Sequence, residues 1–361
     1  MRASDVIVAR LAAQGLSGEA AATPEQVVRR VLAVQAQDLR AGRLAIRSRS
    51  AGLTAAEVDR ALTERRSVVV TWLNRGTLHL VAAEDYHWLQ ALTTPQLASG
   101  NARRLRQEGV SEANAALGVQ IVAERVRAGP QTRDDLRDQL DRAGVPTGGQ
   151  ALVHVLLAAS IAGHIVRGPI VDGRHAFVDV ESWLGAPAPV DRERALVLLA
   201  RRYLAGHGPA DARDLVKWAG ITLGDARRGL VAIAAETEDV GGLLRLLDCT
   251  PGVGLPAPRL LGGFDPILHG WASRELLVGS HQGVVTSGGI FRPTALAGGR
   301  VIATWGLAGG VITVRPFAPI SLPVLDALRA EAADVLRFLG LPPRELVVAR
   351  PAADPASPCS A

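Results

Sequence analysis

The sequence predicts an α+β fold in which a unit of several helices followed by a β-hairpin is repeated and then gives way to a region of short strands. Three observations predict it. Apolar residues recur at helical spacing and then switch to two-residue alternation at residues 68–81. The same order returns in residues 101–190. After about residue 241 the helical periodicity stops and short strands separated by glycines begin.

The first unit is expected in residues 1–100, and its helices have recognisable start signals. Thr23 stands before Pro24, a favoured pair of capping residue and first helical residue, and Thr54 is followed three residues later by Glu57. The patterns predict helices over 5–14, from 24 toward 35 and over 55–65, and strands over 68–73 and 77–81 joined by a turn at 74–76. Helices followed by a hairpin are the outline of a winged helix-turn-helix module.

Two further units are expected, in residues 101–190 and 191–245, because one helix start is repeated. Residues 129–136 align with residues 208–215: each segment has Gly-Pro, a capping residue two positions after the proline, and an Asp-Leu pair three positions later. The pattern predicts helices over 111–127, 133–143, 148–163, 191–205, 211–219 and 223–235, and a hairpin of 165–167 and 175–178. The three units therefore predict three tandem winged helix-turn-helix modules.

The last region, residues 246–350, is predicted to form a small antiparallel β-barrel or sheet followed by a C-terminal helix. Glycine pairs at 288–289 and 298–299 mark turns between the strands. The expected elements are strands over 275–278, 283–286, 300–304 and 311–314, and a helix over 322–339. Residues 351–361 are rich in Pro, Ala and Ser, and we expect a flexible tail.

Length and composition bound the class of protein. The 361 residues, 48% hydrophobic and 21% charged, are enough for two or three domains with sizeable cores. The two cysteines, Cys249 and Cys359, are too few for a disulfide framework or a cysteine-based zinc site. The N-terminus has no hydrophobic leader and no apolar run reaches membrane-spanning length, so we expect a cytoplasmic monomer with no membrane partner.

The net charge is modest, but the choice of basic residue is unusual. The net charge is +5, the isoelectric point is about 10.1, and Lys217 is the only lysine among 40 basic residues. Genomic base composition can produce such an arginine bias. A phosphate-binding face is the other explanation, because guanidinium groups grip phosphate bidentately and strongly basic domains often bind nucleic acid.

Motifs of several enzyme classes are absent. The sequence has no Gly-x-Ser-x-Gly, no Gly-Lys-Ser/Thr phosphate loop and no complete dinucleotide-binding glycine motif. The eight histidines are scattered without metal-ligand spacing, so we expect no metal and no cofactor. His269 and His281 could flank a site in the strand region, but turn positions are the preferred interpretation.

Residues 31–40 contain the first candidate site. An apolar helical stripe leads into Gln35, and Gln37 and Asp38 follow. Residues at i and i+2 do not share a helix face, so both amides can reach one place only if the backbone leaves helical geometry near Ala36. Taken alone, an ordinary polar helix end is the simpler explanation.

The returning strand of the first hairpin contains the second candidate site. Thr77 and His79 are two residues apart and therefore share one strand face. An ordinary exposed hairpin face is the alternative. Arginines near both sites are candidate phosphate contacts, with solvated surface residues as the alternative: Arg40, Arg43, Arg47 and Arg49 after the glutamines, and Arg75 at the hairpin tip.

Gln35-Ala36-Gln37, residues 72–81 with Thr77-Leu78-His79, and residues 263–306 together resemble the AlkZ/AlkX family of winged-helix DNA glycosylases. The resemblance implies three tandem winged helices and a β-barrel around a concave DNA-binding face. It implies excision of bulky N7-alkylguanine adducts, including interstrand crosslinks, from double-stranded DNA. The Gln-Φ-Gln branch implies self-resistance to a genotoxic antibiotic. Ala36 is smaller than the usual apolar residue of the motif, which affects pocket shape more than chemistry.

The resemblance implies catalytic roles for Gln35 and Gln37, supported by Asp38, Thr77 and His79. An N7-alkylguanine is already cationic and leaves readily, so amides that orient a water at C1′ can suffice without a strong base. Asp38 is the second candidate for activating that water.

The scarcity of lysine bears on the reaction type. A glycosylase that also cleaves the strand often forms a Schiff base with a lysine amine, and only Lys217 is available. We therefore expect a monofunctional glycosylase. The alternative is a non-catalytic winged-helix DNA-binding protein, such as a regulator or a factor that sequesters a toxin.

Overall fold

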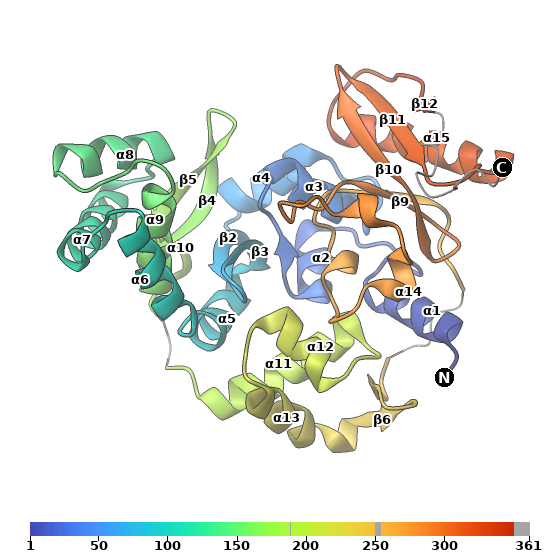
Figure 1. Ribbon diagram of the computed structural model, residues 1–361, viewed down its shortest axis with the longest axis horizontal. Helices are drawn as coiled ribbons and strands as arrows, with labels where there is room; N and C mark the ends of the chain where they lie inside the picture. The colour runs from blue at the N-terminus through green and yellow to red at the C-terminus, as the bar shows by residue number, and fades with distance from the viewer. Residues whose placement is uncertain (188, 250–253, 350–361) are drawn as a thin grey trace, which may run out of the picture.

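Helices and strands follow one another in four blocks of the computed structural model, which describes residues 1–187, 189–249 and 254–349 (Figure 1). The first block contains α1 (Ala3–Ala13), α2 (Pro24–Val31), β1 (Val34–Gln35), α3 (Leu39–Arg47), α4 (Ala55–Thr63), β2 (Val68–Leu73), β3 (Thr77–Ala82) and α5 (Tyr86–Thr93). The second contains α6 (Leu97–Gln107), α7 (Glu112–Ala128), α8 (Arg133–Arg142), α9 (Ala151–Ile161), β4 (Ile165–Val171), β5 (Arg174–Asp179) and α10 (Val180–Leu184).

The third and fourth blocks complete the α+β architecture. The third contains α11 (Arg192–His207), α12 (Ala212–Ala219), α13 (Leu223–Ala232), β6 (Thr237–Asp239) and β7 (Leu244–Leu246). The fourth contains β8 (Arg259–Leu261), α14 (Glu275–Val278), β9 (Thr294–Ala297), β10 (Arg300–Ala308), β11 (Val311–Pro316), α15 (Leu322–Phe338) and β12 (Val347–Val348). The tail expected at 351–361 lies outside the described residues.

The predicted helix starts are confirmed. Thr23 and Thr54 cap α2 and α4, and each closes a capping box with the residue three positions later. The aligned starts of α8 and α12 have the same construction: Thr132 and Asp211 are the caps, and an aspartate three residues on returns to the cap backbone. Each cap satisfies N–H groups that a helix end leaves without an intrahelical partner.

A five-stranded sheet joins the first two blocks, in the order β1-β3-β2-β4-β5. The predicted hairpin of 68–73 and 77–81 is confirmed, and it meets the second hairpin through pairing of Val70 with Arg167. Alternate side chains of the first hairpin enter different cores, one with α5 and α11 to α13, the other with α7 to α9 and the C-terminal sheet. The sheet is therefore covered on both faces, and polar side chains on it need a specific reason.

Of the β-barrel and the sheet that the sequence left open, the C-terminal region forms the sheet, and no closed barrel is seen in the described residues. Its order is β12-β11-β10-β9-β8, and within the described ranges the edge strands β8 and β12 do not pair with each other. The strands predicted at 300–304 and 311–314 and the helix at 322–339 are confirmed. The strand predicted at 275–278 is wrong, because Glu, Leu and Leu favour the short helix α14, which ends at Gly279 with φ +59°. A 3₁₀ turn, Gln282–Val284, replaces the strand predicted at 283–286.

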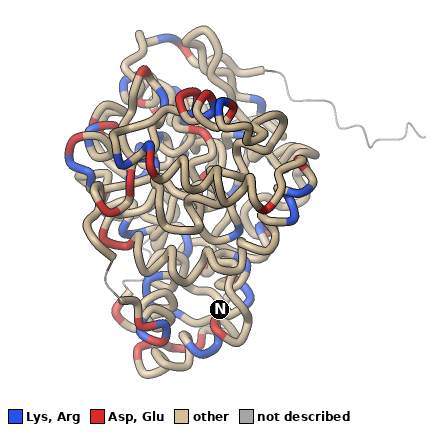
Figure 2. Tube along the Cα trace, turned by 90° about the vertical axis from the view of Figure 1, so that its left-hand side faces the viewer, with Lys and Arg blue, Asp and Glu red and all other residues tan. Residues whose placement is uncertain are grey.

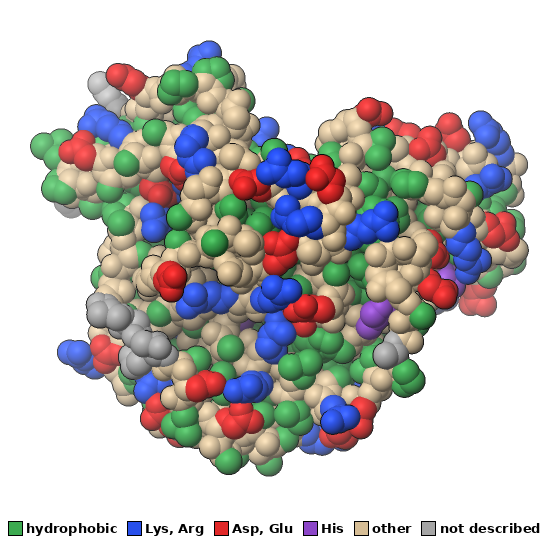
Figure 3. Space-filling model, turned by 180° about the vertical axis from the view of Figure 1, so that it is seen from behind, with side chains coloured by type: hydrophobic (Ala, Val, Ile, Leu, Met, Phe, Trp, Pro, Cys, Tyr) green, Lys and Arg blue, Asp and Glu red, His purple; other side chains and the backbone are tan. Residues whose placement is uncertain are grey.

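The surface is hollowed between two lobes. Seen from behind, a deep notch separates the lobe of α15 and β10 to β12 from the lobe of α7 to α9 and β4–β5 (Figures 1 and 3). Basic and acidic side chains are mixed at its base, and they are also interspersed along the side view (Figure 2). Among the helices described, none combines the length and the apolar character needed to cross a membrane.

Candidate active site

The backbone leaves helical geometry just before the glutamines, as the sequence predicts, but earlier than expected. Helix α2 ends at Val31, and the next residue, Leu32, has a φ of +64° that turns the chain. Strand β1 then begins, and Gln35 lies directly opposite His79 of β3. The ladder continues one residue further, where the Ala36 N–H donates to Leu78 O at 2.8 Å. The glutamine segment is thus an added edge strand of the hairpin sheet.

The two glutamines differ in exposure, and both amides are free. Gln35 is 6% exposed, whereas Gln37 is exposed at the bend that follows the strand. Within the described part of the chain, neither side-chain amide has a hydrogen-bond partner. Asp38 caps α3, and its carboxylate accepts from the Arg40 N–H at 3.1 Å. The segment therefore offers two uncommitted amides, while the neighbouring carboxylate holds a helix end.

His79 stands in the middle of a polar row on one face of the sheet. Residues directly opposite each other in antiparallel strands direct their side chains to the same face, about 4.5–5.5 Å apart at Cβ. Gln35 on one side and Thr71 on the other both pair with His79, and Thr77 shares that face. The structure therefore brings Gln35, Thr77 and His79 together, as expected.

Thr71 is a site residue that the sequence reasoning missed. The signal was present, because a hairpin that turns at 74–76 puts Thr71 opposite His79 by register alone. The Thr71 hydroxyl lies 3.2 Å from the Ser160 hydroxyl of α9, and this hydrogen bond fixes its position. The Thr77 hydroxyl and the Asn74 amide, both buried, have no partner among the described residues. Buried groups of this kind call for an explanation, and a ligand is one.

His79 is a neutral imidazole of defined tautomer. Its Nδ1 lies 2.9 Å from Thr77 O, and because a carbonyl only accepts, Nδ1 carries the proton and Nε2 is the acceptor. The pKa of His79 is lowered to about 4, mainly by burial and in smaller part by the nearby charge of Arg75, while the hydrogen bond to Thr77 O opposes the shift. At neutral pH the ring therefore presents a lone pair without a positive charge.

His269 from the C-terminal region belongs to the same neighbourhood. Burial lowers its pKa to about 3, and Arg75, His79 and Arg274 add to the effect. Its ring lies 4.0 Å from the ring of Phe291. His269 lies in a turn, as the preferred interpretation has it, directly after the 3₁₀ turn Pro266–Leu268, and this turn lies beside the site. Sequence alone could not decide whether His269 flanks the site, because the contact joins segments almost 200 residues apart.

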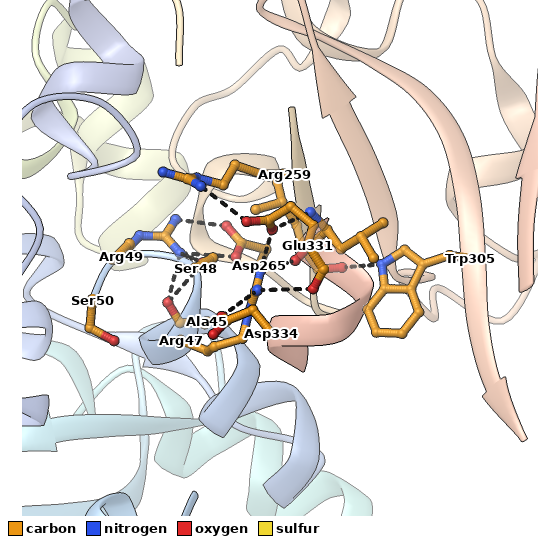
Figure 4. A network of polar contacts seen from close by, with 12 residues as sticks. Ala45, Arg47, Ser48, Arg49, Ser50, Arg259, Asp265, Trp305, Glu331 and Asp334 are labelled. Atoms are coloured by element: carbon orange, nitrogen blue, oxygen red, sulfur yellow. Dashed lines mark hydrogen bonds and ion pairs between the residues drawn. The ribbon is translucent and has the colours of Figure 1, made fainter. Parts of the chain in front are cut away.

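The predicted basic residues divide into two kinds. Arg40 and Arg75 are exposed, and in the described ranges neither makes an ion pair. Arg43 is committed to Asp59, with its Nε donating to the carboxylate at 2.8 Å. Arg47 is 3% exposed and bridges Glu331 at 2.6 Å and Asp334 at 3.0 Å (Figure 4).

Arg49 is buried as deeply as Arg47. Its guanidinium donates two hydrogen bonds to Asp265, at 2.9 and 2.7 Å, and others to Gln14 and Ala45 (Figure 4). Guanidinium groups that are buried this deeply and ion-paired within the protein cannot contact a DNA backbone. The phosphate role expected of Arg47 and Arg49 is therefore wrong. Both residues fasten α3 to the C-terminal region.

No group of three or more His, Cys, Asp or Glu side chains in the described ranges is placed to hold a metal ion. The described residues of the site offer amides, a neutral imidazole and hydroxyls, with arginines at the margin. Such a set can bind and orient an anionic polymer and a water molecule. Helix–hairpin units and free arginines beside a polar site are features that many nucleic-acid-binding proteins share.

Comparison with known proteins makes the class specific. A family model described as DNA glycosylase AlkZ-like matches residues 28–338, and the chain belongs to this AlkZ-like DNA glycosylase family. The chain is similar in structure to the Streptomyces sahachiroi DNA glycosylase AlkZ, with a TM-score of 0.78, 25% sequence identity, and coverage of 96% of this chain and 98% of that chain. No curated protein sequence matches significantly.

The family decides between the two functions that the sequence left open. The protein is a DNA glycosylase. The alternative function, a non-catalytic DNA-binding protein with the same fold, is therefore not required to explain the paired amides.

Proposed function

We propose that this DNA glycosylase hydrolyses the N-glycosidic bond of bulky N7-alkylguanine adducts in double-stranded DNA, including interstrand crosslinks, and leaves an abasic site. We further propose that it acts as a cytoplasmic monomer and protects its host from a genotoxic natural product. The observation that carries the proposal is the pairing of Gln35 with a neutral His79, beside a second free amide at Gln37.

The chemistry of the substrate fits these residues. Alkylation at N7 makes the guanine cationic, so the bond from C1′ to N9 breaks with its electron pair moving to the base, which leaves neutral. No general acid is required, and water supplies the new bond to C1′ and releases its proton. The amide oxygens of Gln35 and Gln37 can each accept a hydrogen bond from that water. Orientation of this kind can lower a barrier by several kcal/mol (about 7 or more in well-aligned cases).

A neutral His79 suits a cationic adduct better than a charged one. An imidazolium beside the cationic base would repel it, whereas the lone pair on Nε2 can accept a hydrogen bond from water or base. The low pKa of His79 makes it a weak proton acceptor, so its role is orientation. Asp38 remains the second candidate for activating the water, although its cap at the start of α3 already occupies one oxygen.

The free arginines and the notch support a placement of the DNA. Arg40 and Arg75 flank the glutamine–histidine row and are our candidate phosphate contacts. Arg43 remains a weaker candidate, because Asp59 already neutralises it. We propose that the helix–hairpin units of residues 1–100, 101–190 and 191–245 are three winged helix-turn-helix modules, that 246–350 forms a separate C-terminal region, and that the duplex lies along the concave face they share (Figure 3).

The absence of lyase chemistry is also part of the proposal. Lys217, the only lysine, is exposed on α12. A Schiff base with the sugar would need an amine in the glutamine–histidine row, where the chain has none. We therefore expect release of the base with the strand intact.

The test is release of modified base from duplexes that carry one N7-methylguanine, one bulky N7-alkylguanine or one N7-linked crosslink. We expect free base from purified protein, and strand scission only after heat or alkali. Gln120→Ala, on the exposed face of α7, is the matched control for glutamine loss and should behave as wild type. Binding of DNA without release of any adduct would contradict the proposal, and scission without heat would contradict its monofunctional part.

A further inference from the structure

A groove of about 360 Å³ lies between the start of α3 and the C-terminal sheet, next to the glutamines. Asp38 and Arg40 form one edge of it, directly after Gln37. Its other walls come from the C-terminal region, and the volume falls in the range of small-molecule sites. The groove therefore begins one residue after the second glutamine of the proposed active site.

The C-terminal walls of the groove are aromatic and apolar. Phe264 and Phe291 lie 5.8 Å apart between ring centroids, and Trp305 completes the wall. The Trp305 indole N–H donates to Leu261 O at 2.8 Å, so its only polar atom is already satisfied and the ring is fixed. Ile290, also on the wall, is 57% exposed. Polar side chains are confined to the Asp38 and Arg40 edge.

Phe264 occupies this wall despite an unfavourable backbone. Its φ is +56°, a conformation that glycine adopts freely and that a bulky aromatic residue rarely does. Such outliers persist where the surroundings over-determine them, and they gather at functional sites. The choice of a phenylalanine at a position suited to glycine indicates that the ring itself is required.

The neighbours of Phe264 hold the strained segment in place. Gly262 lies so close to α3 that a Cβ there would come within 2.9 Å of Leu44 Cβ. Gly263 lies equally close to Phe291 O, also at 2.9 Å. On the other side, Asp265 is fully buried and receives both hydrogen bonds from Arg49 (Figure 4). The same arginine that anchors the end of α3 therefore fixes the ring that faces its start.

Phe264 also connects the groove to the histidine pair. Its ring lies parallel to that of His269, with centroids 6.1 Å apart and an interplanar angle of 14°. Electrostatic interactions with Arg75 and His79 in turn contribute to the lowered pKa of His269. A flat ligand in the groove would contact Phe264 while its reacting end lies at Gln37.

We propose that this groove holds a planar aromatic ring system attached to N7 of the excised guanine, and that Phe264 is a specificity-determining residue that stacks on it. The inference rests on the proposed function, because it names the adduct class of that same site. An unstacked nucleobase is also planar. It has polar edges all round, however, and the groove offers polar partners only on one side.

The test compares three duplexes, each with one N7-substituted guanine: N7-methyl, N7-benzyl and N7-cyclohexylmethyl. The last two match in size, but only benzyl is planar and aromatic. Phe264→Ala should raise KM for the benzyl adduct about tenfold and leave kcat nearly unchanged, whereas KM for the methyl adduct stays within about twofold. Phe264→Tyr keeps the ring and should retain wild-type preference. Phe264→Leu keeps bulk and should lose it.

The outcomes separate the inference from the proposed function. If wild type releases none of the three bases, the proposed function fails. If wild type releases them but Phe264→Ala changes benzyl and cyclohexylmethyl alike, the aromatic role is wrong and the function stands. A third outcome is that Phe264→Ala weakens binding of an undamaged single-stranded oligonucleotide by the same factor as it raises KM for the benzyl adduct. That result would assign the groove to a nucleobase and overturn the inference. An unchanged melting temperature shows that each variant is folded.

Discussion

The two ends of α3 use the same residue type for opposite purposes. At its start, Arg40 is exposed and free of ion pairs in the described ranges, next to Gln37 and Asp38. At its end, Arg47 and Arg49 are almost completely buried and bound to carboxylates of the C-terminal region. The difference is one of partners, since all three are arginines within ten residues.

The buried end determines where the exposed end lies. Arg47 reaches α15 and the Leu260 carbonyl of β8, and Arg49 reaches Asp265, so α3 is fixed to the C-terminal sheet at several points. The start of the helix is then held against the aromatic groove. If the last turn of α3 were not anchored, the position of Gln37 relative to the groove would not be fixed. The comparison thus separates residues that place the site from residues that act in it.

The largest expected effect comes from breaking the buried end. Arg49→Ala leaves the fully buried carboxylate of Asp265 without its partner, which should lower the free energy of unfolding by about 3–5 kcal/mol. Urea denaturation measures it. The control is Arg329→Ala, which removes an exposed ion pair with Asp326 and should change stability by less than about 1 kcal/mol. Equal small losses in both variants would show that the buried network does not hold the helix.

The next effect is catalytic and lies at the exposed end. Gln35→Ala removes an amide that faces His79 but has no partner in the described protein, so stability should change little. We expect the single-turnover rate of N7-methylguanine release to fall about 100-fold, which corresponds to about 2.7 kcal/mol. The melting temperature of the same preparation is the check on folding. A variant that melts early and keeps its rate would assign Gln35 to structure.

A pH-dependent effect distinguishes the histidine of the site. The pKa of His79 is about 4 in the folded protein, against about 6.5 for a free imidazole. The unfolded chain therefore binds a proton below pH 6.5 that the folded protein takes up only near pH 4. The stability that depends on the neutral ring is complete above pH 6.5 and is lost as the pH falls toward 4.

Replacement of that histidine measures the effect. Wild type should lose about 1.4 kcal/mol of unfolding free energy per pH unit more than His79→Gln between pH 6.5 and 4.5. The other buried histidines are present in both proteins and cancel in the difference. Urea midpoints at four pH values give the slopes. Identical slopes for the two proteins would mean that His79 is protonated as readily when folded as when unfolded.

The smallest effect concerns the free arginines. Arg40→Ala and Arg75→Ala should each weaken binding to undamaged duplex and reduce the slope of log K against log salt concentration by about 1. Arg47→Met should leave that slope unchanged, because Arg47 is buried. Fluorescence anisotropy across a salt series measures all three. A lower slope for Arg47→Met would restore the phosphate role that the structure removes.

The local part of this arrangement could be predicted from the sequence. Capping boxes at Thr23 and Thr54, the hairpin, and the shared face of Thr77 and His79 all follow from residues within a few positions of one another. A departure from helical geometry was expected near Ala36 if both amides were to reach one place, and the structure has it earlier, at Leu32.

The non-local part could not be predicted. Arg47 and its partner Glu331 are 284 residues apart, and no pattern around Arg47 distinguishes it from Arg40. The choice between a barrel and a sheet stayed open for a similar reason, because closure depends on whether two distant edge strands meet. The error at residues 275–278 has another cause, since a four-residue segment with three apolar residues is too short to show the periodicity that separates a strand from a helix. Of the site residues that were missed, only Thr71 could have been predicted, from the register of the hairpin.

The central claim is that amides act in this site and that the neighbouring carboxylate serves the helix. Single-turnover release of N7-methylguanine by Gln37→Ala and by Asp38→Asn tests it most directly, because asparagine caps a helix as well as aspartate does. The expected result is a loss of about 100-fold for Gln37→Ala, with Asp38→Asn within a few-fold of wild type. The reverse result, with Asp38→Asn inactive and Gln37→Ala at the wild-type rate, would contradict the claim and make Asp38 the base.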